Sequence, residues 1–384
     1  MPSRIKLHES QECSGQSQYT DGNMGDAPLF DERILITYNL PFPDALCRDI
    51  RRKFRDCEVI FAQSRPEEGV HVPSESYRRA TILVSLQHLP DLKDAKHLKL
   101  IHTFSAGLDH LMSHPVLKAS NVPITNSSGL GAPIGEWVVM NWLIHARNYH
   151  RTYRAQRAHI WDTRLPYVVG SHDQIGKRVG ILGYGSIGRH IARISQAMGM
   201  TVHAYTASPR LTPESRRDNG YILTGTGDPE GSIPVSWHHG TDKASIHAFL
   251  SSGLDHLVVS LPLTPQTTNL IGADELAILS DNCRHPMIKP FLTNISRGKI
   301  LDQDALIGAL ELGLLSGAAL DVADPEPLPA EHPLWDAPNI QISPHVSGMG
   351  QEYFPRALDI LKFNLDRMKQ GLPLVNEYKR GRAY

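Results

Sequence analysis

The sequence predicts an α/β fold built from two doubly wound, parallel-sheet domains. The main evidence is a repeated pattern of short, continuously apolar runs separated by polar stretches that are compatible with helices. Such runs are typical of strands buried on both faces of a parallel sheet. They form two series along the chain: Ile34–Thr37, Val59–Phe61, Thr81–Val84 and Leu100–Phe104, then Val179–Leu182, Thr201–Tyr205, Leu257–Ser260, Phe291–Ile295 and Gly317–Asp321. The length of 384 residues also corresponds to two domains of ordinary size.

The composition is electrically balanced and excludes several function classes. Lys and Arg total 39 and Asp and Glu total 40, so the basic excess that is typical of nucleic-acid-binding proteins is missing. No apolar stretch approaches the ~18 residues of a membrane helix, and no secretory signal pattern is found. The four cysteines form no CxxC pair, which is typical of reduced thiols. We therefore expect a cytoplasmic protein with a small-molecule partner, and neither nucleic acid nor membrane.

Three segments depart from this strand and helix pattern. Residues 1–30 are rich in Ser, Gln, Gly and Asp without periodicity, and we expect a flexible N-terminal arm there. Pro133 suits the first turn of a helix over Ile134–Ile144, whose residues are apolar on almost every face. That helix must be buried between the domains or in a subunit interface. Residues 211–240 form a Gly/Pro/Ser/Thr-rich connection that is unusually long for a loop inside a compact domain.

A GYGSIG motif begins at Gly183, between a strand-like run and a helix-compatible stretch, which is the setting of a dinucleotide-binding turn. We expect Gly183 to permit the tight turn, Gly185 to let backbone approach a pyrophosphate, and Gly188 to let helix and strand pack closely. The amides of Ser186 and Ile187 at the helix start would then face the phosphates. The alternative is an ordinary strand–helix turn, because a chain with 30 glycines contains chance matches.

The end of the following strand predicts which dinucleotide is bound. An acidic residue there would accept the adenosine ribose hydroxyls of NAD, but this chain has Thr206, followed by Ser208 and Arg210. No carboxylate at this turn repels a 2′-phosphate. Two hydroxyls and a guanidinium are present that can bind such a phosphate. We expect NADP as the preferred cofactor, with NAD as a second option. The alternative is a solvated turn without selectivity.

Three polar residues each follow a probable strand: Arg297 in NISRGK, Glu326 in DVADPEP and His345 in SPHVSG. The carboxyl ends of parallel strands form the ligand-binding edge of such sheets. An Arg can bind a carboxylate and polarise a ketone, and a His can give or take the proton of an alcohol. A Glu can orient the imidazole and favour its protonated form. No group of His or Cys has the spacing of metal ligands, so we expect no metal.

With these motifs in place, the chain resembles the D-isomer-specific 2-hydroxyacid dehydrogenase family. The order and spacing of the family's motifs are kept from about Ile34 to the C-terminus, and the last three motifs together are highly specific. The segments that carry the resemblance are Ser105–Asp109, Thr125-Asn126, the helix with Glu136, GYGSIG, Leu261–Pro265, NISRGK, DVADPEP, SPHVSG and Leu374–Asn376.

The resemblance implies a role for each matching residue. Arg297 would bind the substrate carboxylate and carbonyl, His345 would be the acid/base, and Glu326 would be its partner. Main-chain groups of Ala106 and Gly107 would also hold the carboxylate. The residues that the resemblance places against the cofactor are Leu261, Pro262 and, at the nicotinamide amide, Asp321.

The resemblance also implies a domain arrangement. A Rossmann cofactor domain, residues 127–343, would be inserted into a flavodoxin-like substrate domain made of residues 31–126 and 344–384. A homodimer would form through the cofactor domains. The 211–240 connection is longer than the family's usual one, so it could fold over the adenosine, touch a partner subunit or be mobile. We favour the last two.

The function predicted on this basis is hydride transfer between NADP(H) and a 2-oxo acid or D-2-hydroxy acid, similar to glyoxylate/hydroxypyruvate reductases. The substrate side chain stays open, and Tyr38, Leu40 and Phe42 either line it or pack in the core. Formate dehydrogenases share the fold but resemble this pattern with an amide where Glu326 stands, which argues against them. A dinucleotide-sensing corepressor or scaffold of the same fold is the non-enzymatic alternative.

Overall fold

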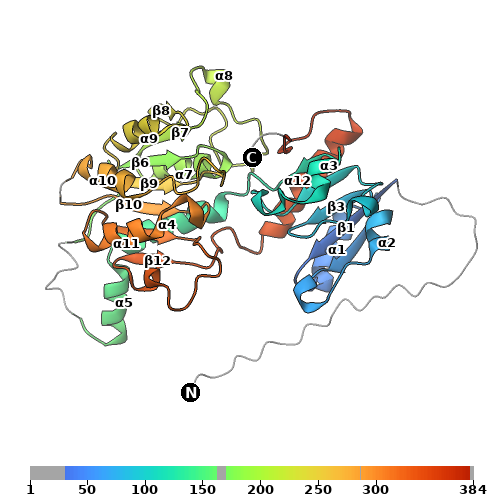
Figure 1. Ribbon diagram of the computed structural model, residues 1–384, viewed down its shortest axis with the longest axis horizontal. Coiled ribbons are helices and arrows are strands. Elements are labelled where there is room, and N and C mark those ends of the chain that lie inside the picture. Colours follow the sequence, from blue (N-terminus) through green and yellow to red (C-terminus); the bar gives the residue numbers. More distant parts are fainter. Residues whose placement is uncertain (1–30, 162–169, 286, 381–384) are drawn as a thin grey trace, which may run out of the picture. The chain divides into compact units, whose positions relative to one another are not determined.

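The computed structural model describes residues 31–161, 170–285 and 287–380. The arm expected over residues 1–30 lies outside them. The chain divides into two compact units: the first runs to Ser127 and resumes over Phe354–Arg382, and the second is Ser128–Tyr353 (Figure 1). The second unit therefore interrupts the first. The expectation from the sequence assigned residues 344–353 to the first unit, whereas they belong to the second. A buried carboxylate described below holds residues 343–347 there.

The first unit contains a five-stranded parallel sheet with the strand order β2-β1-β3-β4-β5. The order reverses between β1 and β3, as in flavodoxin-like sheets. Its strands are β1 (Glu32–Tyr38), β2 (Cys57–Gln63), β3 (Ile82–Ser85), β4 (Leu100–Thr103) and β5 (Ile124–Thr125). Its helices are α1 (Asp44–Lys53), α2 (Ser74–Arg79), α3 (Pro115–Ala119) and α12 (Tyr353–Lys369), which begins at the last residue of the second unit.

The second unit contains a seven-stranded parallel sheet with the order β12-β11-β10-β9-β6-β7-β8. The order reverses between β6 and β9, which is the switch point where doubly wound sheets bind dinucleotides. Its strands are β6 (Arg178–Leu182), β7 (Thr201–Thr206), β8 (Ser236–His239), β9 (His256–Val259), β10 (Phe291–Asn294), β11 (Gly317–Leu320) and β12 (Ile340–Ile342). The predicted fold class of two doubly wound parallel sheets is confirmed.

Helices cover both faces of this second sheet (Figure 1). On one face, Val258 of β9 packs in a core with Val138 and Trp142 of α4 and with Ile191 of α7. On the other face, Leu257 packs in a core supplied by α9, α10 and α11. Consecutive residues of one buried strand thus serve opposite cores, which is why the strands read as continuous apolar runs. The helices are α4 (Ala132–Ala146), α5 (Tyr149–Arg157), α7 (Ser186–Ala197), α8 (Pro213–Arg216), α9 (Lys243–Leu250), α10 (Ala273–Asp281) and α11 (Gln303–Glu311).

A buried histidine joins three elements of the first unit. His102 of β4 is fully buried, with Nδ1 2.9 Å from the Thr125 hydroxyl of β5 and Nε2 3.1 Å from the Ala357 carbonyl of α12. Because a carbonyl only accepts, Nε2 donates its hydrogen there, and Nδ1 accepts from Thr125. Burial lowers the pKa of His102 from 6.5 to about 4. The neutral imidazole therefore ties the returning C-terminal helix to the sheet.

We expect this histidine to make stability depend on pH. Below pH 6.5 the unfolded chain protonates His102 while the folded protein stays neutral, so the free energy of unfolding falls as the pH drops toward 4. The limiting slope is about 1.4 kcal/mol per pH unit. In urea unfolding at pH 7, His102→Gln should be less stable than the wild type, and the gap should narrow toward pH 4.5. The contributions of the other buried histidines are the same in both proteins, so they cancel in the difference between the two unfolding free energies. A difference that does not change with pH would contradict the role of His102.

Candidate active site

The GYGSIG turn connects β6 to α7 at the switch point of the second sheet. Gly183 has φ +107°, and a Cβ there would lie 2.4 Å from the Ser260 carbonyl oxygen of the strand end beside it. A Cβ at Gly188 would lie 2.4 Å from the Gly183 carbonyl oxygen. Glycine is therefore required at both positions. Around Gly185, in contrast, a Cβ would meet no atom within 4 Å, so its backbone faces open space where a ligand can approach.

The first turn of α7, with the amides of Ser186 and Ile187, begins at this edge of the sheet. Its position is fixed through the Ser186 hydroxyl, which lies 2.8 Å from the Ser128 hydroxyl and accepts a hydrogen bond from the Gly129 amide at 3.3 Å. Leu261 and Pro262 follow β9, on the other side of the switch point. The Ser296 hydroxyl donates to the Leu261 carbonyl, and the Thr267 hydroxyl donates to the Pro262 carbonyl at 2.8 Å.

The turn after β7 carries the predicted selectivity residues. The Thr206 hydroxyl donates to the Ser208 carbonyl at 2.8 Å, which closes a tight turn at the end of the strand. Arg210 Nη1 donates to the Ser215 carbonyl at 2.6 Å. The structure thus brings Thr206, Ser208 and Arg210 together in one turn, with the guanidinium bound to the segment that follows.

His345 and Glu326 form a hydrogen-bonded pair at the carboxyl edge of the same sheet. Glu326 Oε2 lies 3.0 Å from His345 Nδ1, and its Oε1 accepts the Ala323 amide at 3.1 Å, which fixes the carboxylate. His345 has φ +55°, in the left-handed region that side chains other than glycine rarely adopt. Such backbone strain persists only where the surroundings impose it, and it clusters at functional sites.

Asp321 imposes that conformation. It follows β11 and is only 1% exposed. Its Oδ1 accepts the Ser343 hydroxyl at 2.6 Å and the Val346 amide at 2.8 Å, and its Oδ2 accepts the Ser347 amide at 2.9 Å. Its own carbonyl accepts the His345 amide at 2.8 Å. The carboxylate therefore holds the whole 343–347 turn.

The positioning role of this carboxylate was not predicted. The resemblance places Asp321 against the nicotinamide amide, which stays a prediction, and the structure adds that both of its carboxylate oxygens accept hydrogen bonds from the 343–347 turn. The serines that flank His345 in SPHVSG were the available signal, because a buried acid needs nearby hydroxyl and amide donors.

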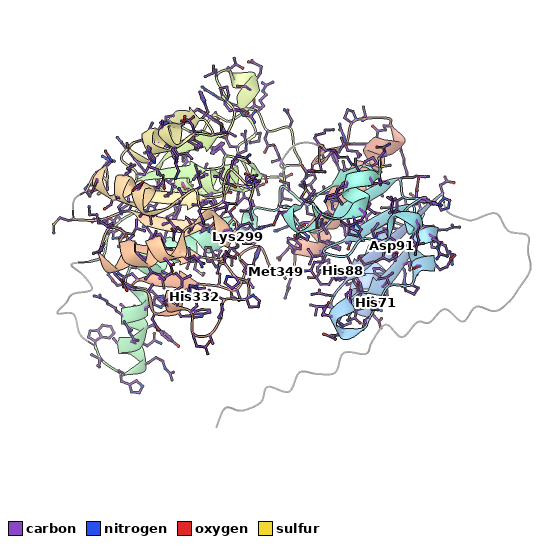
Figure 2. All side chains as sticks on the ribbon, viewed as in Figure 1. His71, His88, Asp91, Lys299, His332 and Met349 are labelled. Atoms are coloured by element: carbon purple, nitrogen blue, oxygen red, sulfur yellow. The ribbon has the colours of Figure 1, made fainter. Side chains whose placement is uncertain are left out.

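Arg297 stands on the loop after β10, next to the loop that carries Glu326. Buried Asn294 brackets the Arg297 loop: its Nδ2 donates to the Arg297 carbonyl at 3.0 Å and its Oδ1 accepts the Ser296 amide at 3.0 Å. A Cβ at Gly298 would lie 2.0 Å from the Ala323 carbonyl, so the two loops touch through their backbones. Lys299, just after Gly298, and Met349, after the His345 turn, are labelled in Figure 2.

Gln303 also holds the Glu326 loop in place. Its Nε2 donates to the Asp324 carbonyl at 2.6 Å, and its Oε1 accepts the Asp324 amide at 3.0 Å. Because β10, β11 and β12 are consecutive neighbours in one sheet, the loops with Arg297, Glu326 and His345 leave it at the same edge.

The first unit carries the two predicted substrate-binding residues in the loop after β4. The Ser105 hydroxyl donates to the Gly107 carbonyl at 2.8 Å, and Asn126 Nδ2 donates to the Ala106 carbonyl at 2.9 Å. With both carbonyls engaged, the conformation of this loop is fixed.

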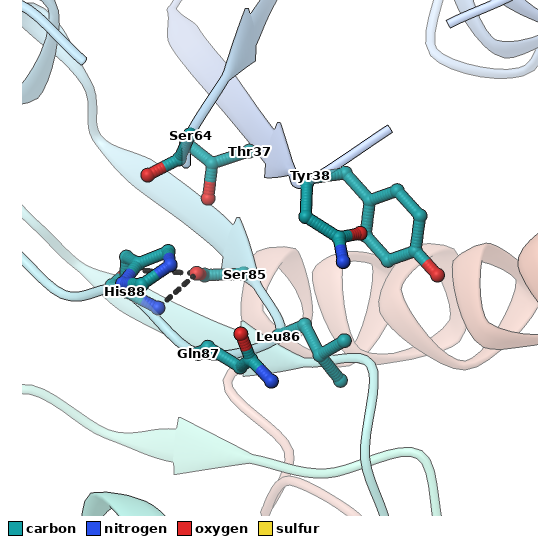
Figure 3. A pocket seen from close by; sticks show the side chains of 8 residues that line it. Thr37, Tyr38, Ser64, Ser85, Leu86, Gln87 and His88 are labelled. Carbon is teal, nitrogen blue, oxygen red and sulfur yellow. Dashed lines mark hydrogen bonds between the residues drawn. The ribbon is translucent and has the colours of Figure 1, made fainter. Parts of the chain in front are cut away.

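A small hollow lies at the carboxyl ends of the first three strands of the same unit (Figure 3). Tyr38 lines it and packs edge-on against Phe354, with ring centroids 4.5 Å apart. Phe42 is buried against Phe61, and Leu40 is 59% exposed. Packing therefore accounts for Phe42, whereas Tyr38 also borders the hollow.

The described residues hold neither a metal-binding cluster nor a membrane-spanning helix. No group of three or more His, Cys, Asp or Glu side chains in that part of the chain is arranged to hold a metal ion. No helix within it is long and apolar enough to cross a membrane.

We expect Gly298→Ala to disrupt the contact between the Arg297 and Glu326 loops. The added methyl overlaps the Ala323 backbone, so the loops must separate, at a cost of about 1–3 kcal/mol in unfolding free energy. The matched control is Gly308→Ala in α11, where a Cβ meets no atom within 4 Å and alanine should stabilise by about 0.5–1 kcal/mol. Chemical denaturation of both variants checks this, and equal stabilities would show that the loop contact is unimportant.

Comparisons with known proteins agree with this geometry. A family model described as "D-isomer specific 2-hydroxyacid dehydrogenase, NAD binding domain" matches residues 139–223 and 229–347, more than half of the chain. Glyoxylate/hydroxypyruvate reductase A of Salmonella newport strain SL254 is 25% identical over 295 residues, covering 75% of this chain and 83% of that protein.

Solved structures match over most of the length. The NADPH-dependent glyoxylate/hydroxypyruvate reductase of Sinorhizobium meliloti, in complex with NADP and sulfate, has a TM-score of 0.68 at 27% identity. A D-isomer specific 2-hydroxyacid dehydrogenase of Xanthobacter autotrophicus Py2, in complex with NADPH and MES, has a TM-score of 0.69 at 26% identity. Each match covers 92% of this chain and 100% of the other. The chain belongs to the D-isomer specific 2-hydroxyacid dehydrogenase family.

Proposed function

We propose that this protein is an NADP(H)-dependent reductase that converts a 2-oxo acid to the D-2-hydroxy acid. The observation that carries the proposal is the 3.0 Å pair of His345 and Glu326, on the same sheet edge as the GYGSIG turn and beside the loop of Arg297. The relatives named glyoxylate/hydroxypyruvate reductases, and the matching structures that contain NADP or NADPH, support the reaction and the cofactor.

In this proposal His345 is the acid that completes the reduction. Glu326 accepts the Nδ1 hydrogen, so Nε2 is the ring nitrogen that presents its proton to the substrate oxygen. The carboxylate also stabilises the imidazolium charge before the proton leaves. In the reverse direction the same Nε2 accepts the proton of the alcohol. The strained backbone of His345, held by Asp321, keeps this nitrogen in one place.

Arg297 is assigned to the substrate carboxylate and ketone, because a guanidinium offers several donors in a planar fork. Its loop is fixed by Asn294 and by the contact of Gly298 with Ala323, so the side chain starts from a rigid base. We assign the main-chain groups of Ala106 and Gly107 to the same carboxylate on the family resemblance.

The residues of the second unit fit a dinucleotide. The open space at Gly185 and the amides of Ser186 and Ile187 suit a pyrophosphate. The turn that Thr206 closes presents the Ser208 hydroxyl and the Arg210 guanidinium, without a carboxylate, to a 2′-phosphate. When bound, NADPH supplies the hydride. Leu261, Pro262 and Asp321 are assigned to the nicotinamide side, and Asp321 acts there by holding the His345 turn.

A panel assay tests the function directly. Oxidation of NADPH and NADH is followed with glyoxylate, hydroxypyruvate, and branched and aryl 2-oxo acids, and the product is analysed for D configuration. We expect turnover with at least one acid and a preference for NADPH. Tight NADPH binding without turnover of any acid would instead favour the dinucleotide-sensing alternative. Glu326, a carboxylate in place of an amide, argues against formate oxidation.

We further propose a homodimer in the cytoplasm. On α4, Met140 is 48% exposed and Leu143 is 40% exposed, although the same helix buries Trp142 completely. On α5, the half-exposed rings of Tyr149 and Tyr153 stack with centroids 5.8 Å apart. These apolar side chains support a subunit interface over α4 and α5. Thiols such as Cys283 that form no disulfide support a reducing compartment.

We expect His345→Ala to lower kcat by about 10²- to 10⁴-fold, the contribution of a positioned general acid. The Kd of NADPH, measured by fluorescence titration, should change by less than about twofold, because the imidazole is not part of the dinucleotide turns. His97→Ala, which removes an exposed histidine of the first unit, is the control and should keep full activity. Unchanged turnover in His345→Ala would overturn the mechanism.

We expect Thr206→Asp to shift the cofactor preference toward NADH. A carboxylate at the end of β7 would accept the ribose hydroxyls of NADH and repel the 2′-phosphate of NADPH. The ratio of kcat/KM for NADPH over NADH should fall at least about tenfold, a change of roughly 1.4 kcal/mol. Thr201→Asp, the same substitution at the opposite, exposed end of β7, should leave the ratio unchanged. An equal ratio in both variants would refute the role of Thr206.

A further inference from the structure

Residues 211–235, here called the insertion, join the turn after β7 to β8 and take no part in the mechanism above. The sequence favoured a mobile segment or a partner contact for this region. In the structure the insertion is instead held by hydrogen bonds and packing contacts to the dinucleotide-binding elements of its own unit, and its last residues lead into strand β8, which pairs with β7. The expectation of a mobile loop does not fit these contacts.

Arg189 is the main anchor of the insertion. It stands in the first turns of α7, and its side chain is 5% exposed. Its guanidinium donates to the carbonyls of Arg216 and Asp228, both at 2.6 Å, and lies 3.7 Å from the Asp218 carboxylate. It also stacks over the Tyr184 ring at 5.1 Å. A buried charge is tolerated only when it is fully bonded, so these contacts bind the insertion firmly to the helix.

Asp228 forms a second anchor, and its partner belongs to the GYGSIG motif. The Tyr184 hydroxyl donates to Asp228 Oδ2 at 2.9 Å, and Asp228 is only 3% exposed. The same carboxylate accepts the Ser232 and Ile233 amides at 3.1 and 3.2 Å. It therefore organises the returning half of the insertion around the second residue of the motif.

The other end of the insertion is bound to the turn that carries the selectivity residues. Arg210 Nη1 donates to the Ser215 carbonyl at 2.6 Å, and Arg216 Nε donates back to the Arg210 carbonyl at 2.9 Å. The Arg216 guanidinium also lies over the Trp237 ring of β8, at 5.6 Å. Arg216 is thus shared: its side chain holds the Arg210 backbone, and its carbonyl is held by Arg189.

A third contact reaches the start of α7. Gly129 has φ +105°, and a Cβ there would lie 2.4 Å from the Tyr221 carbonyl oxygen, so the insertion packs directly on this backbone. The Gly129 amide in turn donates to the Ser186 hydroxyl at 3.3 Å. The insertion consequently connects the ribose turn after β7 with the helix start assigned to the pyrophosphate.

We propose that the insertion is a clamp for the adenosine half of NADP(H), with Arg189 as its positioning residue. This inference rests on the proposed function. The 2′-phosphate and the pyrophosphate are two anionic groups of one ligand, and their binding elements must be held at a set separation before the ligand arrives. Holding them in advance lowers the ordering cost of binding, so the clamp raises affinity without touching the reacting atoms.

The test compares Arg189→Lys and Arg189→Met with the wild type by fluorescence and calorimetric titration. The Kd of NADPH and of adenosine 2′,5′-bisphosphate should each rise at least about tenfold. At saturating NADPH, kcat and the KM of the 2-oxo acid should stay within about twofold, a split that general loss of structure would not produce. The control, Arg217→Ala, removes an exposed ion pair with Glu230 in the same insertion and should change none of these values.

Two further measurements test the clamp if the Arg189 variants do not fold. Asp228→Asn, which keeps the volume but loses an acceptor, should raise the Kd of NADPH in the same direction. In the wild-type protein, NADPH should slow hydrogen exchange of the 211–235 amides. Wild-type protein that binds no NADPH would overturn the proposed function, and the clamp with it. Wild-type binding with unchanged exchange and unchanged variant affinities would overturn the clamp alone.

Discussion

The candidate site depends first on one buried carboxylate. Asp321 ends β11 and accepts hydrogen bonds from side chains and amides of the 343–347 turn, which forces His345 into its left-handed conformation. Without these bonds the turn after β12 would relax, and the imidazole would lose its orientation toward Glu326. The same bonds explain why the turn belongs to the second compact unit. The proposed acid, His345, is therefore built on the sheet that binds the dinucleotide. The Asp321 carboxylate both sets the conformation of His345 and keeps its turn in this unit.

Around this carboxylate, the neighbouring loops are held by amide side chains that bond to the backbone and by one direct backbone contact. Asn294 brackets the Arg297 loop, Gln303 brackets Asp324, and Gly298 lies directly against Ala323. Amide groups suit this task because each offers a donor and an acceptor to one peptide unit. The proposed reactive side chains thus extend from a platform in which the supporting polar groups are satisfied, and such preorganisation is what charge development in a reaction requires.

The apolar runs of the sequence predicted the central strands, and the glycine motif predicted the switch point. The strands that lie outside these apolar runs are short or lie at sheet edges: β5 has two residues, β8 reads SWHH, and β12, which was expected only as a strand before the SPHVSG motif, reads IQI. Edge strands are covered on fewer sides, so they need not be continuously apolar. The Arg189 anchor could not be predicted either. An arginine on a helix is ordinarily solvated, and only the folded insertion supplies the carbonyls that bury it.

The insertion of one unit into the other has a consequence for synthesis on the ribosome. The His102 side chain bonds to the Ala357 carbonyl, 255 residues further along the chain. At translation rates of roughly 5–20 residues per second, roughly 10–50 s pass between the synthesis of β5 and the synthesis of α12. All seven strands of the interrupting unit, up to Ile342, are synthesised before α12 begins at Tyr353. The nascent chain therefore passes through a state in which all strands of both sheets have been synthesised while the first sheet still lacks the helix α12 that His102 will bind.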